Sequence, residues 1–206
     1  MDGYTHEQFR RDLENPNLVH LNSREHFKAF YEELGKMPEQ EKQCYLRERM
    51  DFVKPEGRLL ELGCHNGFNL VHYALQGFNI TGVDVSETLI AAARQRMNAS
   101  HPYVKKKIKL FCGFIEDFES DELYDTIIIT EVLEHCIDPL AILKKAKTLL
   151  ARGGKIYITS PSSKWGNSSH VRGVSPAQLR EWLEAVGLNV ELCEDIGGLT
   201  RAIAKL

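Results

Sequence analysis

The sequence contains 206 residues, of which 43% are hydrophobic and 27% are charged, and its formal net charge is −3. This length fits one domain of ordinary size, and the composition excludes disordered, fibrous and collagen-like chains. The balance of charges gives no global electrostatic attraction to nucleic acid or to an anionic membrane surface. No apolar run approaches the roughly 18 residues of a membrane-spanning helix, so we expect no insertion into a membrane.

Two further features of the sequence indicate the cellular compartment of the protein. The amino-terminal residues are polar and acidic, which is unlike a secretory signal peptide. The chain has five widely spaced cysteines and no C-x-x-C pair. An odd number of cysteines at such spacing is typical of reduced thiols rather than of a disulfide framework. We therefore expect a cytoplasmic protein.

The first part of the chain, residues 1–54, is charged and helical in character and shows no strand signal. It contains an apolar stripe at the spacing i, i+3, i+4, i+7, which predicts an amphipathic helix. We expect an N-terminal helical cap over residues 1–54, which either packs against a sheet or closes over a substrate, and one further domain over residues 55–206. The stripe consists of Phe27, Phe30, Tyr31 and Leu34.

From Arg58 onward, apolar runs typical of strands alternate with amphipathic helical stretches, which is the signature of βαβ units around a parallel sheet. The run Ile127–Ile129 is apolar without alternation, as expected for a strand that is covered on both faces. The predicted strands are Arg58–Leu62, Asn79–Asp84, Ile108–Cys112, Tyr124–Thr130 and Lys155–Ser160. The predicted helices lie near Gly67–Ala74, Glu87–Asn98 and Leu140–Ala151, with another from Ser175 to about Val186.

The end of the chain predicts a β-hairpin. Val190 and Leu192 alternate with a charged residue, the pair Gly197-Gly198 suits a tight turn, and the residues from Leu199 to the end are extended in character. The predicted fold is therefore an α/β, Rossmann-like doubly wound sheet. It has five parallel strands and a C-terminal antiparallel hairpin, which makes seven strands in all.

The most informative stretch runs from Glu61 to Phe68 and reads E-L-G-C-H-N-G-F, which predicts a strand end, a sharp turn and a helix start. A backbone can approach a ligand closely only where side chains are absent, which explains Gly63 and Gly67. Asp84 lies 21 residues after Gly63, at the end of the second predicted strand. A carboxylate at this place can accept both hydroxyls of a ribose.

The glycine spacing favours one class of ligand over another. A dinucleotide-binding turn needs glycines where this sequence has His65 and Phe68. A G-x-x-x-G turn that follows an acidic residue, Glu61, suits a nucleoside that carries an amino acid, because no pyrophosphate has to be bound. The alternative is a tight βα turn that binds no ligand.

With these motifs, the chain from about Arg58 to its end resembles the class I S-adenosylmethionine-dependent methyltransferases. The stretch E-L-G-C-H-N-G looks like the first motif of that family, although the family usually has a glycine where His65 stands, and Asp84 looks like its ribose-binding acid. Residues 113–117 and 149–155 are similar to two further family segments. The resemblance implies S-adenosylmethionine as co-substrate, bound by Glu61, Gly63, His65, Gly67, Asp84, Val85, Phe114, Ile115 and Thr130.

A second group of polar residues follows the fourth and fifth predicted strands. Carboxyl ends of adjacent parallel strands meet at one edge of a sheet, so His170 is expected near the E-x-x-E-H stretch that starts at Glu131. Two carboxylates and two imidazoles suit a divalent metal that binds a substrate hydroxyl and lowers its pKa. The arrangement resembles two branches of the family, the O-methyltransferases of ubiquinone synthesis and the small-RNA 2′-O-methyltransferases. The resemblance implies Glu131, Glu134, His135 and His170 as ligands of Mg²⁺ or Mn²⁺.

An alternative without metal stays open, because the same stretch occurs in methyltransferases that bind none. In that case His135 or His170 is the catalytic residue, acting as a general base, since an unperturbed imidazole titrates near neutral pH. Either mechanism serves transfer to oxygen more readily than to nitrogen.

The sequence thus predicts a methyltransferase that acts on a small-molecule acceptor. An RNA 2′-O-methyltransferase is one alternative, but the acidic balance and the single basic run, Lys105–Lys107 with Lys109, give it little support. A nucleoside-binding module without catalysis is the other. The sequence identifies neither the acceptor nor the oligomeric state.

Overall fold

The structure is a computed structural model that describes residues 52–164 and 170–206. The predicted cap over residues 1–54, with its apolar stripe, lies outside the described residues except for its last three positions. Among the described residues, none of the helices combines the length and the apolar character of a membrane-spanning segment.

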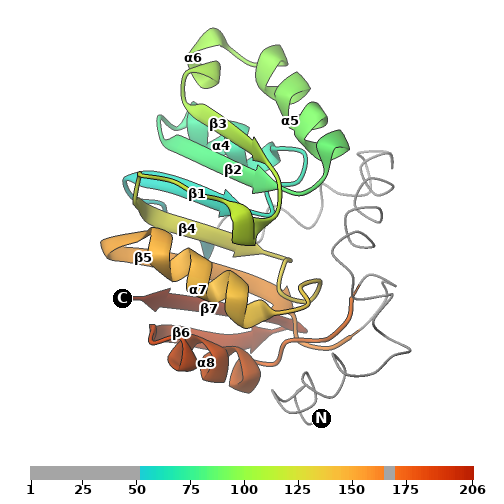
Figure 1. The fold of residues 1–206 in the computed structure, drawn as a ribbon, viewed down its shortest axis with the longest axis vertical. Coiled ribbons are helices and arrows are strands. Elements are labelled where there is room, and N and C mark those ends of the chain that lie inside the picture. Colours follow the sequence, from blue (N-terminus) through green and yellow to red (C-terminus); the bar gives the residue numbers. More distant parts are fainter. Residues whose placement is uncertain (1–51, 165–169) are drawn as a thin grey trace.

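The described residues form a seven-stranded sheet with the strand order β3-β2-β1-β4-β5-β7-β6 (Figure 1). Strands β1 to β5 pair in parallel, and β7 lies antiparallel between β5 and β6. This confirms the predicted parallel sheet and its terminal hairpin. The strands are β1 Arg58–Leu62, β2 Asn79–Asp84, β3 Ile108–Cys112, β4 Tyr124–Thr130, β5 Leu150–Pro161, β6 Asn189–Ile196 and β7 Leu199–Lys205.

One predicted boundary is wrong. The sequence placed the start of the fifth strand at Lys155, whereas β5 begins at Leu150, and α7 therefore ends at Leu149 rather than at Ala151. The cause is tertiary pairing: Leu150 pairs with Tyr124 of β4, and the register then shifts so that Thr126 pairs with Lys155.

Three of the longer helices begin where the sequence offers a side chain that accepts from free backbone amides. Ser86, Asp138 and Ser175 each cap a helix in this way, and proline occupies the start of the two later ones. The helices are α4 Phe68–Leu75, α5 Glu87–Ala99, α6 Pro102–Lys105, the 3-10 turn η2 Ile115–Asp117, α7 Pro139–Leu149 and α8 Pro176–Ala185.

Helices cover both faces of the sheet, which explains the continuous apolar run in β4. Ile127 and Ile129 face a core that includes residues of α7 and α8. Ile128 faces the opposite core, which includes residues of α4, α5 and α6. Figure 1 shows α7 and α8 together on one side of the sheet.

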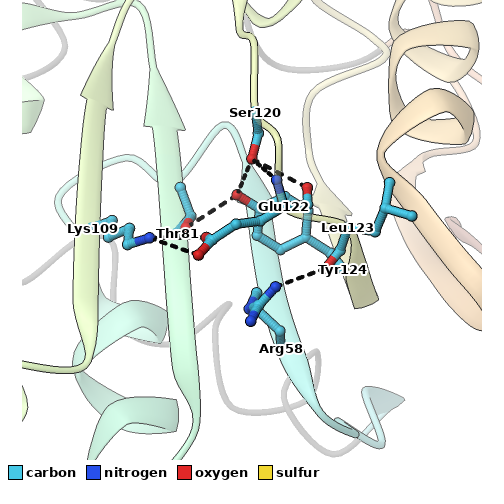
Figure 2. A network of polar contacts seen from close by, with 7 residues as sticks. All are labelled: Arg58, Thr81, Lys109, Ser120, Glu122, Leu123 and Tyr124. Carbon is cyan, nitrogen blue, oxygen red and sulfur yellow. Dashed lines mark hydrogen bonds and ion pairs between the residues drawn. The ribbon is translucent and has the colours of Figure 1, made fainter.

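The connection between β3 and β4 contains only the short turn η2, and a polar network holds it in place (Figure 2). The hydroxyl of Tyr124 donates to Thr81 Oγ1 at 3.3 Å and lies 3.3 Å from Ser120 Oγ. Lys109 Nζ lies 2.9 Å from both carboxylate oxygens of Glu122. Arg58 donates to a backbone carbonyl of the same loop. The network fixes the loop that also carries residues 113–117.

We expect Tyr124→Phe to lower the free energy of unfolding by about 1 kcal/mol, because the buried Thr81 hydroxyl loses its donor. Urea denaturation measures the loss. Glu122→Gln is the matched control, since the ion pair that it weakens is solvent-exposed and exposed pairs add little stability. Equal losses in the two variants would contradict the role assigned to the tyrosine.

Candidate active site

The glycine turn between β1 and α4 is closed by backbone hydrogen bonds and by one tight packing contact. The amides of Gly63 and Cys64 donate to Val83 O of β2 at 2.8 and 2.9 Å. Gly63 has a φ of 81°, and a Cβ at this position would lie 2.5 Å from Val132 Cγ2. Only glycine meets both conditions. Gly67, the other predicted glycine, is the N-cap of α4.

Asp84 ends β2 with its carboxylate held by two backbone amides. Oδ2 accepts from the amide of His65 at 2.8 Å, and Oδ1 accepts from the amide of Ser86 at 3.0 Å. A carboxylate oxygen can accept more than one hydrogen bond, so a carboxylate at this place suits the two hydroxyls of a ribose. Val85 lies between Asp84 and the helix cap, in the short connection to α5.

His65 has a φ of 50°, in the left-handed region that side chains seldom adopt. A residue held in this conformation costs on the order of 1 kcal/mol, and such residues cluster at functional sites. Here the conformation accompanies the bond from the His65 amide to Asp84. The predicted cofactor residue His65 is thus part of the same turn as Gly63 and Asp84.

Glu61 is buried beneath the turn, and Asn69 Nδ2 of α4 donates to its Oε1 at 2.6 Å. Burial raises the pKa of Glu61 to about 8; the bond from Asn69 lowers this pKa and the charge of Asp84 raises it. Among the described residues, Glu61 Oε2 and Asn69 Oδ1 are buried without a hydrogen-bond donor. Two such acceptors side by side suit a ligand that carries an ammonium group. The sequence analysis missed Asn69, because a polar residue in a helix carries no signal of its own.

The loop after β3 places two further predicted residues near Asp84. The amide of Gly113 donates to Asp84 O at 2.9 Å, and η2 begins two residues later, at Ile115. Phe114 and Ile115 are both half-buried, and Ile115 packs against the core. The structure therefore brings these residues and Asp84 to one edge of the sheet. Thr130 reaches the same edge as the last residue of β4.

The second predicted group lies at this carboxyl edge, in the turn after β4 and the segment before α8. One ligand atom from each of Glu134, His135 and His170 lies within 4.8 Å of the others. The centroids of the two imidazole rings are 4.7 Å apart, and the rings are inclined at 70°. Glu134 is fully buried and His170 nearly so. We call these three residues the EHH cluster.

Glu131, the fourth predicted ligand, is not among the residues of the EHH cluster. Its Oε1 accepts from Thr159 Oγ1 of β5 at 3.2 Å, and its φ is 54°. Glu131 therefore begins the sharp turn at the end of β4, and its amide donates to Thr159 O at 2.9 Å. The structure places this carboxylate against β5.

Two more residues that sequence reasoning missed hold the EHH cluster. Ser160 Oγ, at the end of β5, donates to Glu134 Oε2 at 2.7 Å. The guanidinium of Arg172, which is buried, donates to backbone carbonyls of the turn after β4. A serine in a strand and an arginine before a helix are common without any function, so neither carried a usable signal.

Two buried or partly buried thiols near the site, those of Cys64 and Cys136, are not in the reactive form. Burial raises the pKa of Cys64 and that of Cys136, and the acidic groups of Asp84 and Glu116, respectively, raise them further. Both thiols are therefore neutral at physiological pH, and the thiolate is the reactive form.

A glycine turn after the first strand, an acidic residue at the end of the second and this strand order together define the class of S-adenosylmethionine-dependent methyltransferases. A family described as "Methyltransferase domain" matches residues 37–192. The match covers more than half of the chain, so the protein belongs to this methyltransferase family. The resemblance inferred from the sequence motifs is confirmed at this level.

Individual relatives agree with the family. The ubiquinone biosynthesis O-methyltransferase of Xanthomonas euvesicatoria pv. vesicatoria (strain 85-10) is 26% identical over 163 residues, which is 69% of this chain and 65% of the relative. That of Xylella fastidiosa (strain 9a5c) is 27% identical over 177 residues, 73% of this chain and 69% of the relative. The chain thus spans about two thirds of the length of these curated relatives.

Solved structures share the fold at low sequence identity. The DhpI complex with S-adenosylhomocysteine has a TM-score of 0.67 at 18% identity and covers 93% of this chain and 98% of its own. The glycopeptide N-methyltransferase MtfA in complex with S-adenosylhomocysteine also has a TM-score of 0.67, at 16% identity, with 77% and 86% covered.

The buried Glu61 gives a pH-dependent test of the site without ligand. Because its pKa is about 8 in the folded protein against 4.5 as the ordinary value, the folded state binds more protons than the unfolded state between these values. The free energy of unfolding therefore falls as the pH rises from about 4.5 to 8. We expect Glu61→Gln to stabilise the protein relative to wild type at pH 8.5, on the order of a few kcal/mol, and progressively less toward pH 5.

Urea denaturation at both pH values measures this difference. Glu122→Gln is the control, because Lys109 holds the pKa of Glu122 below its usual value, so its titration lies outside the window. A stability difference between Glu61→Gln and wild type that is the same at pH 5 and pH 8.5 would show that Glu61 is ionised in the folded protein.

Proposed function

We propose that the protein transfers a methyl group from S-adenosylmethionine to an oxygen atom of a small-molecule acceptor. The observation that carries this proposal is the EHH cluster, which lies at the same edge of the sheet as the glycine turn and Asp84. The names of the O-methyltransferase relatives support oxygen as the acceptor atom.

Different residues of the site would bind different parts of the cofactor. Asp84, with Val85 beside it, would accept from the ribose hydroxyls, and the half-buried pair Phe114 and Ile115 would contact the adenine. The sulfonium and the methionine part would then lie toward the end of β4. The residues that we assign to the methionine end are Glu61, Gly63, His65, Gly67 and Thr130.

Methyl transfer to a hydroxyl requires an acceptor oxygen that loses its proton and attacks the methyl carbon in line with the carbon–sulfur bond. The bond from oxygen to carbon forms as the bond to sulfur breaks, and S-adenosylhomocysteine leaves as a neutral thioether. The sulfonium is already a good leaving group, so the protein contributes positioning and removal of the proton. The EHH cluster would supply the second of these.

The donor set of the EHH cluster fits a divalent metal. One carboxylate and two imidazoles are ligands that Mn²⁺ and related ions accept, and Ser160 holds Glu134 in a fixed orientation. When bound, Mg²⁺ or Mn²⁺ would lower the pKa of an acceptor hydroxyl. Glu134, His135 and His170 would hold the ion. Glu131 lies outside this cluster and accepts from Thr159, so it is not one of the three proposed ligands.

A general base is the alternative that keeps the same reaction without a metal. His135 or His170 would then accept the proton of the acceptor hydroxyl, and Glu134, whose Oε1 lies 3.7 Å from His135 Nε2, would stabilise the resulting imidazolium. The two mechanisms use the same residues and differ in their response to added metal.

The position of the basic run supports a small molecule over RNA. Lys105–Lys107 precede β3 and therefore lie at the amino edge of the sheet, opposite the candidate site. Lys107 Nζ is 5.5 Å from the centroid of the Tyr103 ring, and Lys109 is paired with Glu122. These lysines do not continue the surface around the EHH cluster.

The thermal melt of the protein with S-adenosylhomocysteine and Mn²⁺ tests the proposal in two variants. A ligand at a hundred times its dissociation constant stabilises the folded state by about 2.7 kcal/mol. We expect Asp84→Asn to lose most of the rise caused by S-adenosylhomocysteine. We expect His170→Ala to keep that rise but to lose any further rise caused by Mn²⁺.

The outcomes separate the alternatives. A rise with S-adenosylhomocysteine and none with Mn²⁺ would favour the general base. A Mn²⁺ response that survives in His170→Ala would place the metal elsewhere. No response of the wild-type protein to S-adenosylhomocysteine would contradict the assignment of the cofactor site.

A further inference from the structure

We infer that Arg172 is a positioning residue that holds the turn bearing Glu134 and His135 against the segment bearing His170. The positioning role of Arg172 is inferred from the hydrogen bonds of its guanidinium alone. The effect of this role on methyl transfer rests on the proposed function.

The guanidinium of Arg172 donates hydrogen bonds to three backbone carbonyls of the turn between β4 and α7. Its Nη1 donates to Leu133 O at 3.3 Å and to Cys136 O, and its Nη2 donates to Ile137 O at 3.2 Å. This turn belongs to no helix and no strand, so its carbonyls do not have the regular partners that secondary structure supplies. Arg172 provides these partners from a different part of the chain.

A backbone contact next to Arg172 continues the same connection. The amide of Val171 donates to Glu134 O at 3.0 Å, within the turn that also carries His135. His170 directly precedes Val171, so the residues on either side of His135 and the residues that follow His170 are joined by hydrogen bonds. The separation of the two imidazole rings, 4.7 Å between centroids, depends on this connection.

The residues that follow Arg172 in the sequence are held in place as well. The amide of Val174 donates to Pro161 O at 2.8 Å. A Cβ on Gly173 would lie 2.4 Å from the backbone of Ser163, so the two chain segments run in direct backbone contact. Arg172 therefore extends from an anchored segment, and movement of its guanidinium would move the turn rather than the segment.

The chemistry requires arginine at this position. A planar guanidinium offers five donors in a fixed arrangement, whereas the ammonium of lysine is a compact point charge on a flexible stem. Arg172 is 4% exposed, and burying a cation is costly unless it is paired or hydrogen-bonded. Three backbone carbonyls, those of Leu133, Cys136 and Ile137, accept from this guanidinium and supply such hydrogen bonds.

The experiment compares Arg172→Lys with wild type in the 206-residue chain, with the protein saturated with S-adenosylhomocysteine. With histidine side chains labelled, the nuclear Overhauser effect between the rings of His135 and His170 reports their contact without any metal. We expect the effect in wild type and its loss in Arg172→Lys, with unchanged affinity for S-adenosylhomocysteine. Arg180→Lys, on the exposed face of α8, is the matched control and keeps the effect.

A second measurement is the affinity for Mn²⁺ alone. Changes to residues that orient metal ligands typically cost tenfold or more in metal affinity, and we expect a loss of roughly tenfold in Arg172→Lys. If neither protein binds Mn²⁺, the metal part of the proposed function fails, while the contact between the rings still tests Arg172. If Arg172→Lys does not fold, Arg172→Ala with added methylguanidinium replaces it, and we expect the added cation to restore the contact.

The inference is overturned if the ring contact persists in folded Arg172→Lys or in folded Arg172→Ala without methylguanidinium. It is also overturned if Arg180→Lys loses the contact to the same extent, because the effect would then reflect general loosening of the fold.

Discussion

The contact between Gly63 and Val132 joins the two halves of the candidate site. Val132 occupies the space that a side chain on Gly63 would need, so the glycine turn after β1 packs directly on the turn after β4. The first turn carries the groups that suit the cofactor, and the second carries Glu134 and His135. Because parallel strands β1 and β4 are neighbours in the sheet, a methyl donor bound at the first turn would lie beside the residues that we propose to activate the acceptor.

Each half of the candidate site contains buried carboxyl groups that accept hydrogen bonds. In the cofactor half, Asp84 accepts from two backbone amides, whereas the buried Glu61 has one donor, from Asn69, and a raised pKa. In the acceptor half, Ser160 donates to the buried Glu134. The burial of Glu61 costs stability in the free protein and suits a cationic ligand.

The sequence predicted the fold well, because buried parallel strands and capped helices have strong local signals. The uniform run Ile127–Ile129 and the turn at Gly197-Gly198 led to the correct sheet and hairpin. The start of β5 could not be predicted, since it depends on pairing with β4. At the site, the sequence predicted the glycines and the acidic residues at strand ends, and the structure brings most of them together. The sequence did not predict roles for Asn69, Ser160 and Arg172, because these roles exist only through contacts between distant segments.

The decisive measurement is a crystal structure of the protein with S-adenosylhomocysteine and Mn²⁺, with the metal located by its anomalous scattering. We expect the ribose hydroxyls to lie on Asp84, the sulfur to point toward the EHH cluster, and manganese to be bound by Glu134, His135 and His170. A cofactor whose sulfur points away from these three residues would show that they do not face the methyl donor.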